Sequence, residues 1–319
     1  MSFFNTPSGD PLAKILIGDS LRMQHLRSKI YTLGPSTVPV FIAGPTGGGK
    51  ELVANALHIT SKRKGQFVAF NVCAVSDTMF EDALFGHIKG AFTGALAASS
   101  GYMAEADNGT LFLDEIGGLP GAAQVKLLRA IDLQQFRSVG SSRDSKSNFR
   151  AIAASNEDLR SMAQDGRFRA DLYHRLATVT LEVPPLSERR EDIPQLVNAF
   201  LSGVNAEASA GIAANALNDI MMGEWPGNVR QLKHFVALAA TLAGSHVITR
   251  DVVREALEFA PKSQRSATVP DMKDRVLLQT LEETHGGIGE TAKRLGVHRA
   301  TIYRRLKRLQ QQRPKHGRE

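Results

Sequence analysis

The residues best suited to chemistry form a phosphate-binding motif, Gly44-Pro-Thr-Gly-Gly-Gly-Lys50, followed by Glu51. Glycines let the backbone fold tightly round a phosphate with its N–H groups inward, and Lys50 can reach the outer phosphates. The motif follows an apolar segment and precedes a good helix former, Glu51-Leu-Val-Ala-Asn-Ala-Leu. This context is the one that a phosphate loop requires. Because Glu51 replaces the usual magnesium-binding Ser or Thr, a chance glycine-rich turn is the alternative on this motif alone.

Paired acids, Asp114-Glu115, end the apolar segment Thr110-Leu-Phe-Leu, downstream of the phosphate-binding motif. In nucleotide hydrolases the first acid commonly holds the metal that bridges the phosphates, and the second can polarise the attacking water. An isolated Asp-Glu pair after a strand is usually a solvated turn or a helix cap. Together with Gly44–Lys50, the pair predicts a site for nucleotide hydrolysis.

Between these two groups lies an uncharged hexapeptide, Gly90-Ala-Phe-Thr-Gly-Ala95. Gly90 and Gly94 permit a tight turn, and Phe92 at its tip would be an exposed aromatic with no core to enter. Exposed apolar surface usually marks a contact site. We interpret the hexapeptide as an output tip that nucleotide hydrolysis elsewhere moves. The alternative is an ordinary surface turn whose Phe folds back onto its own domain.

Alternating strand-like and helix-like segments position these groups. Strands are expected at Val38–Ala43, Phe67–Asn71, Thr110–Glu115, Phe149–Asn156 and Thr178–Val183, with helices at Ile15–Leu33 and Ala122–Ile131 and a polar loop at Gly140–Asn148. This alternation predicts a mainly parallel α/β sheet with its site at the carboxyl ends of the strands. The polar ends of two strands, at Asn71 and Asn156, would then face the same site as the paired acids.

Two arginines, Arg169 and Arg175, precede the last expected strand. Arginine suits the stabilisation of charge on a transferred phosphoryl group, and a neighbouring subunit can supply it. A pair of surface salt bridges is the alternative.

From Leu186 to Ala260 the pattern becomes helical and predicts a small second domain. Its expected helices are Ile193–Val204, Asn215–Met222, Asn228–Ala243 and Thr249–Ala260. Arg230 falls in the first turn of the third helix, away from the end that the helix dipole favours for a cation. This position suggests contact with phosphates, or pairing with a nearby acid.

The C-terminal segment has the spacing of a helix-turn-helix, after a proline-bounded linker at Pro261–Pro270. Helices are expected at Met272–Thr284, Ile288–Leu295 and His298–Leu309, with a turn at Gly296-Val297. In such a motif the second helix enters the major groove of DNA. Arg299, Thr301 and Arg304 would face the DNA, while Arg305 and Arg308 suit phosphates. A helical dimerisation hairpin is the alternative.

Charge and composition agree with a nucleic-acid-binding tail on a globular chain. The 319 residues carry a net charge of +7, and residues 262–319 hold 14 Lys/Arg against 6 Asp/Glu, whereas residues 1–261 hold 25 against 26. A basic segment of this kind is typical of nucleic-acid binding. No apolar run approaches the ~18 residues that would span a bilayer, and no secretory signal is recognisable, so a cytoplasmic location is expected. The single cysteine, Cys73, is expected to be a small buried hydrophobe.

Together these residues resemble the sigma-54-dependent transcription activators, the bacterial enhancer-binding proteins of the AAA+ ATPase class. The similarity runs from Ile15 to Leu309 and rests on Gly44–Glu51, Phe85–Ala95, Leu113–Ile116, Phe168–Leu176 and Trp225–Leu232. Gly90–Ala95 is the most specific segment, because other AAA+ proteins generally lack it. The resemblance implies a tail (1–13), an AAA+ α/β ATPase domain (14–185), a helical lid domain (186–260), a linker (261–270) and a helix-turn-helix DNA-binding domain (271–319).

The resemblance also implies roles for individual residues in a ring, usually a hexamer, that hydrolyses ATP with Mg²⁺. The nucleotide-binding residues would be Gly44, Pro45, Thr46, Gly47, Gly48, Gly49, Lys50, Glu51, Asn156 and Arg230. The catalytic residues would be Asp114, Glu115, Asn71, Arg169 and Arg175. Asp114 would hold the magnesium, Glu115 would activate water under restraint by Asn71, and Arg169 and Arg175 would come from the next subunit.

The implied partners are the sigma-54 RNA polymerase and double-stranded DNA at upstream activating sites. The residues that contact the sigma factor, and through which the closed promoter complex is remodelled, would be Gly90, Ala91, Phe92, Thr93, Gly94 and Ala95. The residues that contact DNA would be Arg299, Thr301, Arg304, Arg305 and Arg308. No membrane partner is expected.

Pro45, Gly48, Val72-Cys73 and Ser138 depart from the family pattern, but none removes a catalytic side chain. The ATPase pattern begins within about twenty residues of Met1, so control is expected, by analogy alone, from expression level or from a separate regulatory protein or paralogue. One alternative is a DNA-binding regulator with a weak or silent ATPase in a mixed ring with a paralogue. Another is a different AAA+ remodeller, such as a helicase loader, which poorly fits Gly90–Ala95.

Overall fold

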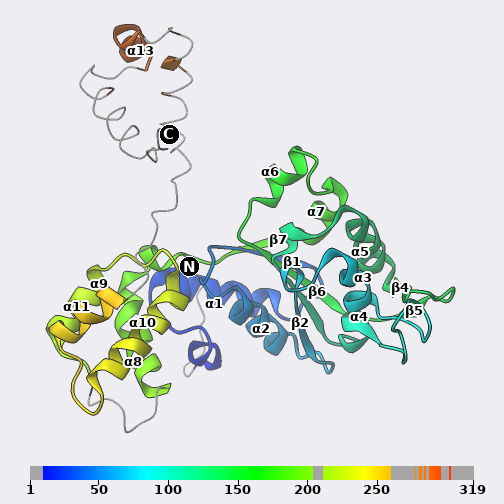
Figure 1. Cartoon of the computed structure of the whole chain (residues 1–319), viewed down its shortest axis with the longest axis horizontal. Helices are drawn as coiled ribbons and strands as arrows, with labels where there is room; N and C mark the ends of the chain where they lie inside the picture. The colour runs from blue at the N-terminus through cyan, green and yellow to red at the C-terminus, as the bar shows by residue number, and fades with distance from the viewer. Residues whose placement is uncertain are drawn as a thin grey trace, which may run out of the picture. The chain divides into compact units, whose positions relative to one another are not determined.

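The computed structural model describes residues 10–203 and 211–259, and in the C-terminal part residues 277, 280, 281, 284, 287–295 and 302. The chain divides into two units, Met1–Ala260 and Pro261–Glu319, and each is described by itself (Figure 1). The expected linker at Pro261–Pro270 lies outside the described residues. Within the described part, no helix is both long and apolar enough to cross a membrane.

A five-stranded parallel sheet forms the centre of the first unit, in the order β2-β3-β6-β1-β7. Its strands are β1 (Val40–Ala43), β2 (Phe67–Asn71), β3 (Thr110–Asp114), β6 (Arg150–Ser155) and β7 (Val179–Glu182). Asn71 pairs in register with Asp114, and Ala43 with Ser155, so the carboxyl ends of four strands meet at one edge. The predicted parallel α/β fold is confirmed, with the polar strand ends gathered on one side.

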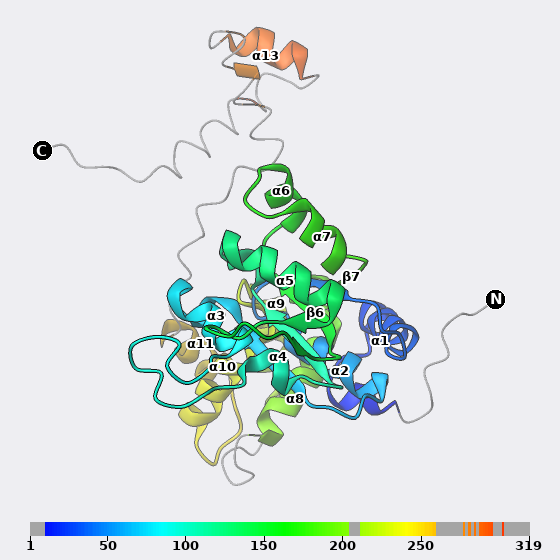
Figure 2. The same ribbon diagram turned by 90° about the vertical axis from the view of Figure 1, so that its right-hand side faces the viewer.

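The three central strands are buried on both faces, because successive strand residues point to opposite sides and both sides are apolar. In β6, Ala151 and Ala153 join one core while Ile152 and Ala154 join the other. Helices α1 (Leu21–Leu33) and α2 (Lys50–Ser61) cover the second face. The first face is covered by α3 (Asp77–Phe85), α4 (Gly101–Glu105), α5 (Gly121–Leu133), α6 (Leu159–Gln164) and α7 (Ala170–Leu176). Figure 2 shows α5, α6 and α7 grouped on their side of the sheet.

A helical lid with its own hydrophobic core follows the sheet. Two short 3-10 turns, Leu186–Glu188 and Arg190–Asp192, lead into it. Its helices are α8 (Ile193–Gly203), α9 (Ala214–Met222), α10 (Asn228–Ala243) and α11 (Arg250–Phe259). The third expected helix, Asn228–Ala243, is found with the same bounds, and the other lid helices begin within one residue of their expected starts.

Three local expectations were wrong. The segment expected as one helix from Ile15 is broken: a 3-10 turn at Pro11–Lys14 precedes α1, which starts only at Leu21. Gly18 takes a φ of +131° there, and Ser20 caps the new helix by accepting from the amide of Met23. The polar loop at Gly140–Asn148 contributes a short strand, β5 (Ser145–Lys146), which pairs antiparallel with β4 (Gln135–Phe136).

Cys73 is exposed rather than buried. The chain leaves β2 at Asn71 and enters a 3-10 turn, Val72–Ala74, in which Val72 takes the buried position. The turn therefore places the thiol outside the core. Partial desolvation of the exposed thiol, together with the nearby negative charges of Glu115, Glu157 and Asp114, still raises the pKa of Cys73.

In the second unit, the described residues form part of a small helical core. Helix α13 (Ile288–Arg294) contributes Ala292, which is buried with Leu277 and Ile302. Residues 277, 280 and 281 are helical, within the expected helix Met272–Thr284. Ile302 is helical and 1% exposed. The candidate DNA-contact residues Arg299, Thr301, Arg304, Arg305 and Arg308 lie outside the described residues.

Candidate functional site

The phosphate-binding motif forms a tight loop between β1 and α2. Gly47 and Gly49 take φ values of +72° and +104°, which side-chain-bearing residues rarely adopt. A Cβ at Gly47 would also lie 2.3 Å from the carbonyl oxygen of Gly227 in the lid. Lys50 opens α2 and is only 6% exposed, and its Nζ donates to the carbonyl oxygen of Gly44 at 3.2 Å. The loop geometry is thus that of a phosphate cradle with its lysine folded inward.

The paired acids lie opposite this lysine. Glu115 Oε1 lies 3.8 Å from Lys50 Nζ, and the amide of Glu115 donates to Asp114 Oδ1 at 3.0 Å. Burial, and then the adjacent charge of Glu115, raises the pKa of the Asp114 carboxyl. Glu115 itself has a left-handed φ of 53°, a costly conformation for a residue with a side chain. Strain and unfavourable charge are therefore concentrated at these two residues.

A divalent cation fits this donor set only together with phosphate. Among the described residues, no group of three or more His, Cys, Asp or Glu side chains could hold a metal. Mg²⁺ is usually held by one or two carboxylates plus phosphate oxygens and water rather than by a protein cage. The pKa of Asp114 is raised by burial and by a neighbouring carboxylate, so its charged form is disfavoured. A bound cation would stabilise that charged form.

The two asparagines at the strand ends make different contacts. Asn156 Nδ2 donates to Thr46 Oγ1 at 3.1 Å, and the Asn156 amide donates to Glu115 Oε2 at 3.4 Å. Asn156 therefore connects the phosphate loop with the second acid. Asn71 lies beside Asp114 in the sheet register, but its Oδ1 accepts from the amide of Cys73 at 2.9 Å. Its amide group caps the turn that follows β2.

The lid and its entrance hold the phosphate loop through backbone carbonyls. The Arg230 amide donates to the Gly47 carbonyl at 3.2 Å, and Asn228 Nδ2 donates to that of Thr46 at 3.1 Å. Arg189, which is 3% exposed, donates from Nη2 to the Gly48 carbonyl at 3.0 Å. Sequence reasoning singled out Arg230 but missed Asn228 and Arg189. Arg189 stands in a charged run, Glu188–Asp192, that reads as solvated surface.

An open cleft of about 540 Å³ joins these groups. It is lined by Thr46, Gly47, Gly49, Lys50, Glu51, Leu52, Asp114, Glu115, Phe200, Val229, Arg230, Lys233 and His234. A smaller, mostly apolar pocket of about 70 Å³ shares Gly49, Leu52, Phe200 and Val229 with the cleft and adds Ile15, Leu16 and Ile17. Sequence reasoning missed this apolar wall. A molecule with charged groups at one end and a flat apolar group at the other matches this arrangement.

Arg169 and Arg175 do not line this cleft. Arg169 pairs with Asp171 through two contacts, of 3.0 and 2.7 Å, and Arg175 Nε lies 2.7 Å from Asp132 Oδ1 on α5. The side chains of both arginines are about half exposed. Within one chain they form surface ion pairs.

The Gly90–Ala95 hexapeptide forms a compact exposed turn. The Gly90 amide donates to the Ala95 carbonyl at 2.9 Å, and the Ala95 amide donates to the Phe92 carbonyl at 3.0 Å. Phe92 is 41% exposed and Thr93 is exposed, whereas Ala95 is 7% exposed and supports the turn from below. The Phe92 ring lies edge to face with that of His87 at 5.0 Å. The tip thus offers Phe92 and Thr93 as surface.

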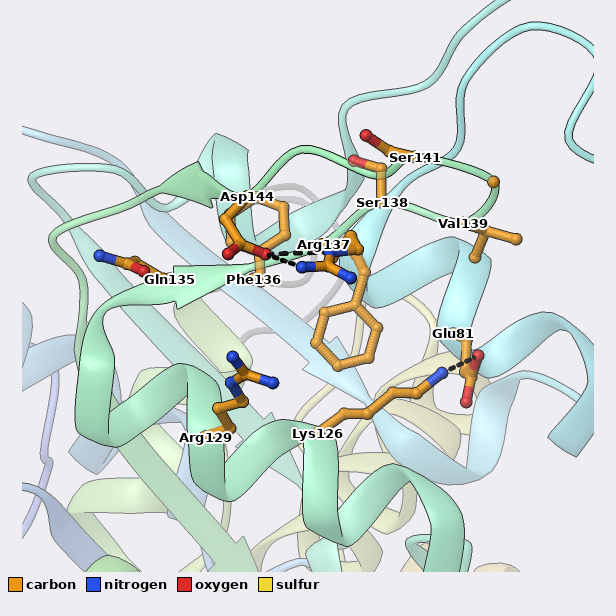
Figure 3. A pocket seen from close by; sticks show the side chains of 12 residues that line it. Glu81, Lys126, Arg129, Gln135, Phe136, Arg137, Ser138, Val139, Ser141 and Asp144 are labelled. Atoms are coloured by element: carbon orange, nitrogen blue, oxygen red, sulfur yellow. Dashed lines mark hydrogen bonds and ion pairs between the residues drawn. The ribbon is translucent and has the colours of Figure 1, made fainter.

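The β4–β5 hairpin lies beside the base of this loop. The Val139 amide donates to the Gly86 carbonyl at 2.8 Å, and the Ile88 amide donates to the Val139 carbonyl at 3.2 Å. Below the hairpin is an open pocket of about 360 Å³ (Figure 3). Ion pairs between Lys126 and Glu81, and between Arg137 and Asp144, lie in its wall. The loop and the hairpin therefore form one connected surface, on elements other than those that line the cleft.

Comparisons with known proteins agree along the chain. Residues 16–182 match the Sigma-54 interaction domain, 187–270 the AAA+ ATPase lid domain, and 268–309 the Fis family of bacterial regulatory proteins. The chain is 41% identical over 301 residues to the transcriptional regulatory protein ZraR of Escherichia coli K12, covering 92% of this chain and 68% of ZraR. It is 39% identical over 340 residues to the DNA-binding transcriptional regulator NtrC of Klebsiella pneumoniae, covering 96% and 72%.

Among solved structures, the crystal structure of NtrX from Brucella abortus in complex with ADP superimposes with a TM-score of 0.70 at 33% identity, covering 94% of this chain and 70% of NtrX. The matched domains follow one another in the order of the sheet, the lid and the C-terminal helices. The chain therefore belongs to the sigma-54-dependent DNA-binding transcription activators, whose sigma-54 interaction domain is a P-loop AAA+ ATPase domain.

Proposed function

We propose that this protein hydrolyses ATP and uses the cycle to remodel the closed promoter complex of sigma-54 RNA polymerase through Gly90–Ala95. One observation carries the proposal: Lys50, Asp114, Glu115 and Arg230 line a single cleft between sheet and lid. These are the residue types that bind phosphates, a metal and an attacking water. Such a protein works in the cytoplasm on upstream DNA, bound by the helix-turn-helix.

ATP is proposed to lie with its phosphates on the Gly44–Lys50 loop and its base against the apolar wall. The related NtrX was crystallised with ADP and also with ATP. Backbone amides of the loop and the N-terminus of α2 would bind the phosphate oxygens. Asp114 would hold Mg²⁺, which supplies charge neutralisation to the phosphates when bound. Leu52, Phe200 and Val229 would contact the flat base.

Hydrolysis is proposed to begin when Lys50 exchanges partners. At present Lys50 Nζ lies near the carboxylate of Glu115 and the carbonyl of Gly44. Phosphate oxygens would attract this ammonium more strongly than one carboxylate at 3.8 Å. Glu115 would then be available to accept a proton from water. The amide of Asn156 would hold the carboxylate by donating to its Oε2. Asn71, beside Asp114, would contact Glu115 once its side chain leaves the amide of Cys73.

Arg169 and Arg175 are proposed to complete the site of the next subunit in a ring. There they would contact the outer phosphate of the bound nucleotide. Their absence from the cleft of their own chain supports a role in trans. In that case each arginine must leave its present acid, Asp171 or Asp132. Exposed ion pairs are worth only ~0–1 kcal/mol, so the exchange costs little. A hexamer and control by a separate protein or paralogue are part of this proposal.

The test is purified protein assayed for ATP hydrolysis over a range of concentrations, with open-complex formation by sigma-54 polymerase measured in parallel. We expect hydrolysis per chain to rise with concentration as rings form. Open complexes should require both ATP and the sigma-54 form of the polymerase. No hydrolysis at any concentration would instead favour a regulator with a silent ATPase that works in a mixed ring. If ATP is hydrolysed but sigma-54 polymerase forms no open complexes, a different AAA+ remodeller would be favoured.

A further inference from the structure

His87 lies at the base of the Gly90–Ala95 loop with both ring nitrogens in contact with acceptors. Its Nε2 donates to the carbonyl oxygen of Ala97 at 2.9 Å, and its Nδ1 contacts Oδ1 of Asp82 on α3. A carbonyl oxygen can only accept, so Nε2 is the donor in its contact with Ala97. The ring therefore connects the returning arm of the loop to α3.

The backbone of His87 joins three segments at the same point. Its amide donates to the Ser99 carbonyl at 3.0 Å, and its carbonyl accepts from the Ser99 amide at 2.9 Å. On its other side His87 forms a parallel bridge with Val139 of the β4–β5 hairpin. The two arms of the loop and the hairpin are thus closed together at one residue, whose side chain is 13% exposed.

Above this base, the two glycines of the loop lie in open space. A Cβ placed at Gly90 or at Gly94 would meet nothing within 4 Å. Phe92 contacts the His87 ring edge to face, with the two ring planes at 62°. An edge-to-face aromatic contact has a preferred geometry and is worth ~0.5–1.5 kcal/mol beyond the area that it buries. The direction of the tip thus depends on the base below it.

Helix α3 is a firm support for this arrangement. Its Phe80 is 1% exposed and packs on Phe70 of β2, with ring centroids 5.4 Å apart. Asp82, two residues further along the same helix, is the residue that contacts His87. The sheet, α3, His87 and Phe92 therefore form a continuous chain of contacts from the core to the tip.

We propose that His87 is a positioning residue that fixes the direction of the Gly90–Ala95 loop, so that Phe92 and Thr93 are presented to the sigma factor. This inference rests on the proposed function of the loop. His87 does not line the nucleotide cleft, so we expect it to have no direct part in hydrolysis. It acts through its two ring hydrogen bonds and its contact with Phe92.

The experiment compares His87→Gln and Asp82→Ala with His246→Gln, a control at an exposed lid histidine. We expect ATP hydrolysis within about twofold of the parent for all three variants. Open complexes formed per ATP hydrolysed should fall about tenfold or more for His87→Gln and Asp82→Ala only, as expected when a working group is misplaced. Asp82→Asn keeps an acceptor oxygen and should retain more coupling than Asp82→Ala. Unchanged coupling in His87→Gln would overturn the proposal.

Hydrogen exchange separates this inference from the proposed function. In His87→Gln, the amides of Gly90, Ser99 and Val139 should exchange faster, while peptides from β3 and β6 keep their protection. Unchanged exchange at the loop base in His87→Gln would overturn the positioning role of His87, even if sigma-54 activation is demonstrated. The parent protein could instead form no open complexes while exchange at the loop base is faster in His87→Gln. In that case the positioning role of His87 stands and the proposed partner of the loop is wrong.

Discussion

The ammonium of Lys50 lies 3.8 Å from the carboxylate of Glu115, so the lysine of the phosphate loop and the second acid of β3 neutralise each other. Lys50 is 6% exposed, which makes a compensating partner important for its charge. In the proposed cycle, phosphate takes this lysine and releases the glutamate. The contact therefore describes a resting arrangement of the two residues.

Glu115→Gln tests the role of this glutamate. The amide keeps the shape and can still contact Lys50, but it cannot accept a proton from water. We expect the rate of ATP hydrolysis to fall by about 10²–10⁴-fold, the usual contribution of a general base. Binding of ATP, followed by titration calorimetry, should be retained. Hydrolysis within tenfold of the parent rate would contradict the assignment.

Asp114→Asn separates stability from function. Burial and Glu115 raise the pKa of Asp114, so the folded state binds the proton more tightly than the unfolded state. Stability from this residue is therefore lost as pH rises through the folded pKa, and the charged form is unfavourable at neutral pH.

We accordingly expect Asp114→Asn to raise the melting temperature at pH 7 in the absence of nucleotide. The difference from the parent should shrink as pH falls toward the pKa range of the carboxyl. Hydrolysis supported by Mg²⁺ should be lost in the same variant. A lower melting temperature at pH 7 would show that the Asp114 carboxylate stabilises the fold instead.

Arg175→Ala should abolish or strongly reduce hydrolysis with little effect on folding. Its pair with Asp132 is about half exposed, so its loss should change the free energy of unfolding by less than ~1 kcal/mol. Urea unfolding and steady-state hydrolysis measure the two effects.

The same variant tests action in trans by mixing. A ring containing Arg175→Ala and Glu115→Gln chains includes sites with an intact glutamate that face an intact arginine. Hydrolysis should therefore reappear when the two inactive proteins are combined. If mixing restores nothing, although each protein assembles with the parent chain, Arg175 does not act on a neighbour.

Gly47→Ala tests the contact between phosphate loop and lid, with Gly166→Ala as a matched control. The two glycines have φ values of +72° and +73°, so alanine meets the same backbone cost of ~1–2 kcal/mol at both. Only at Gly47 would the new Cβ lie 2.3 Å from a backbone oxygen, that of Gly227, whereas Gly166 has open space. Gly47→Ala should therefore lose more stability in urea and bind ATP more weakly. Equal losses at both positions would contradict the close approach of the lid.

Local patterns were sufficient for most of the sheet and for the chemical groups at its edge. Strands such as Phe67–Asn71 are short, apolar and followed by polar residues, and parallel pairing brings their ends together. Helix α10 was predictable from its apolar spacing. Lys50, Asp114 and Glu115 could be placed in one cleft because each follows a strand or opens a helix.

Contacts between distant segments could not be predicted from local patterns. Arg189 and Gly48 are 141 residues apart, and Asn228 and Thr46 are 182 apart, so no periodicity connects them. Cys73 was misplaced because one residue of turn after β2 decides which side chain enters the core. The pairing of Arg175 with Asp132 also depends on how α5 and α7 pack.

Thr93→Ala separates coupling from hydrolysis, since Thr93 is exposed at the loop tip and outside the cleft. Thr241→Ala, at an exposed threonine of the lid, is its control. ATP hydrolysis and open-complex formation on a sigma-54 promoter are measured with the same preparations. We expect Thr93→Ala to keep substantial hydrolysis and to lose open-complex formation, while the control keeps both. Normal open-complex formation by Thr93→Ala would contradict the claim that Gly90–Ala95 couples hydrolysis to remodelling.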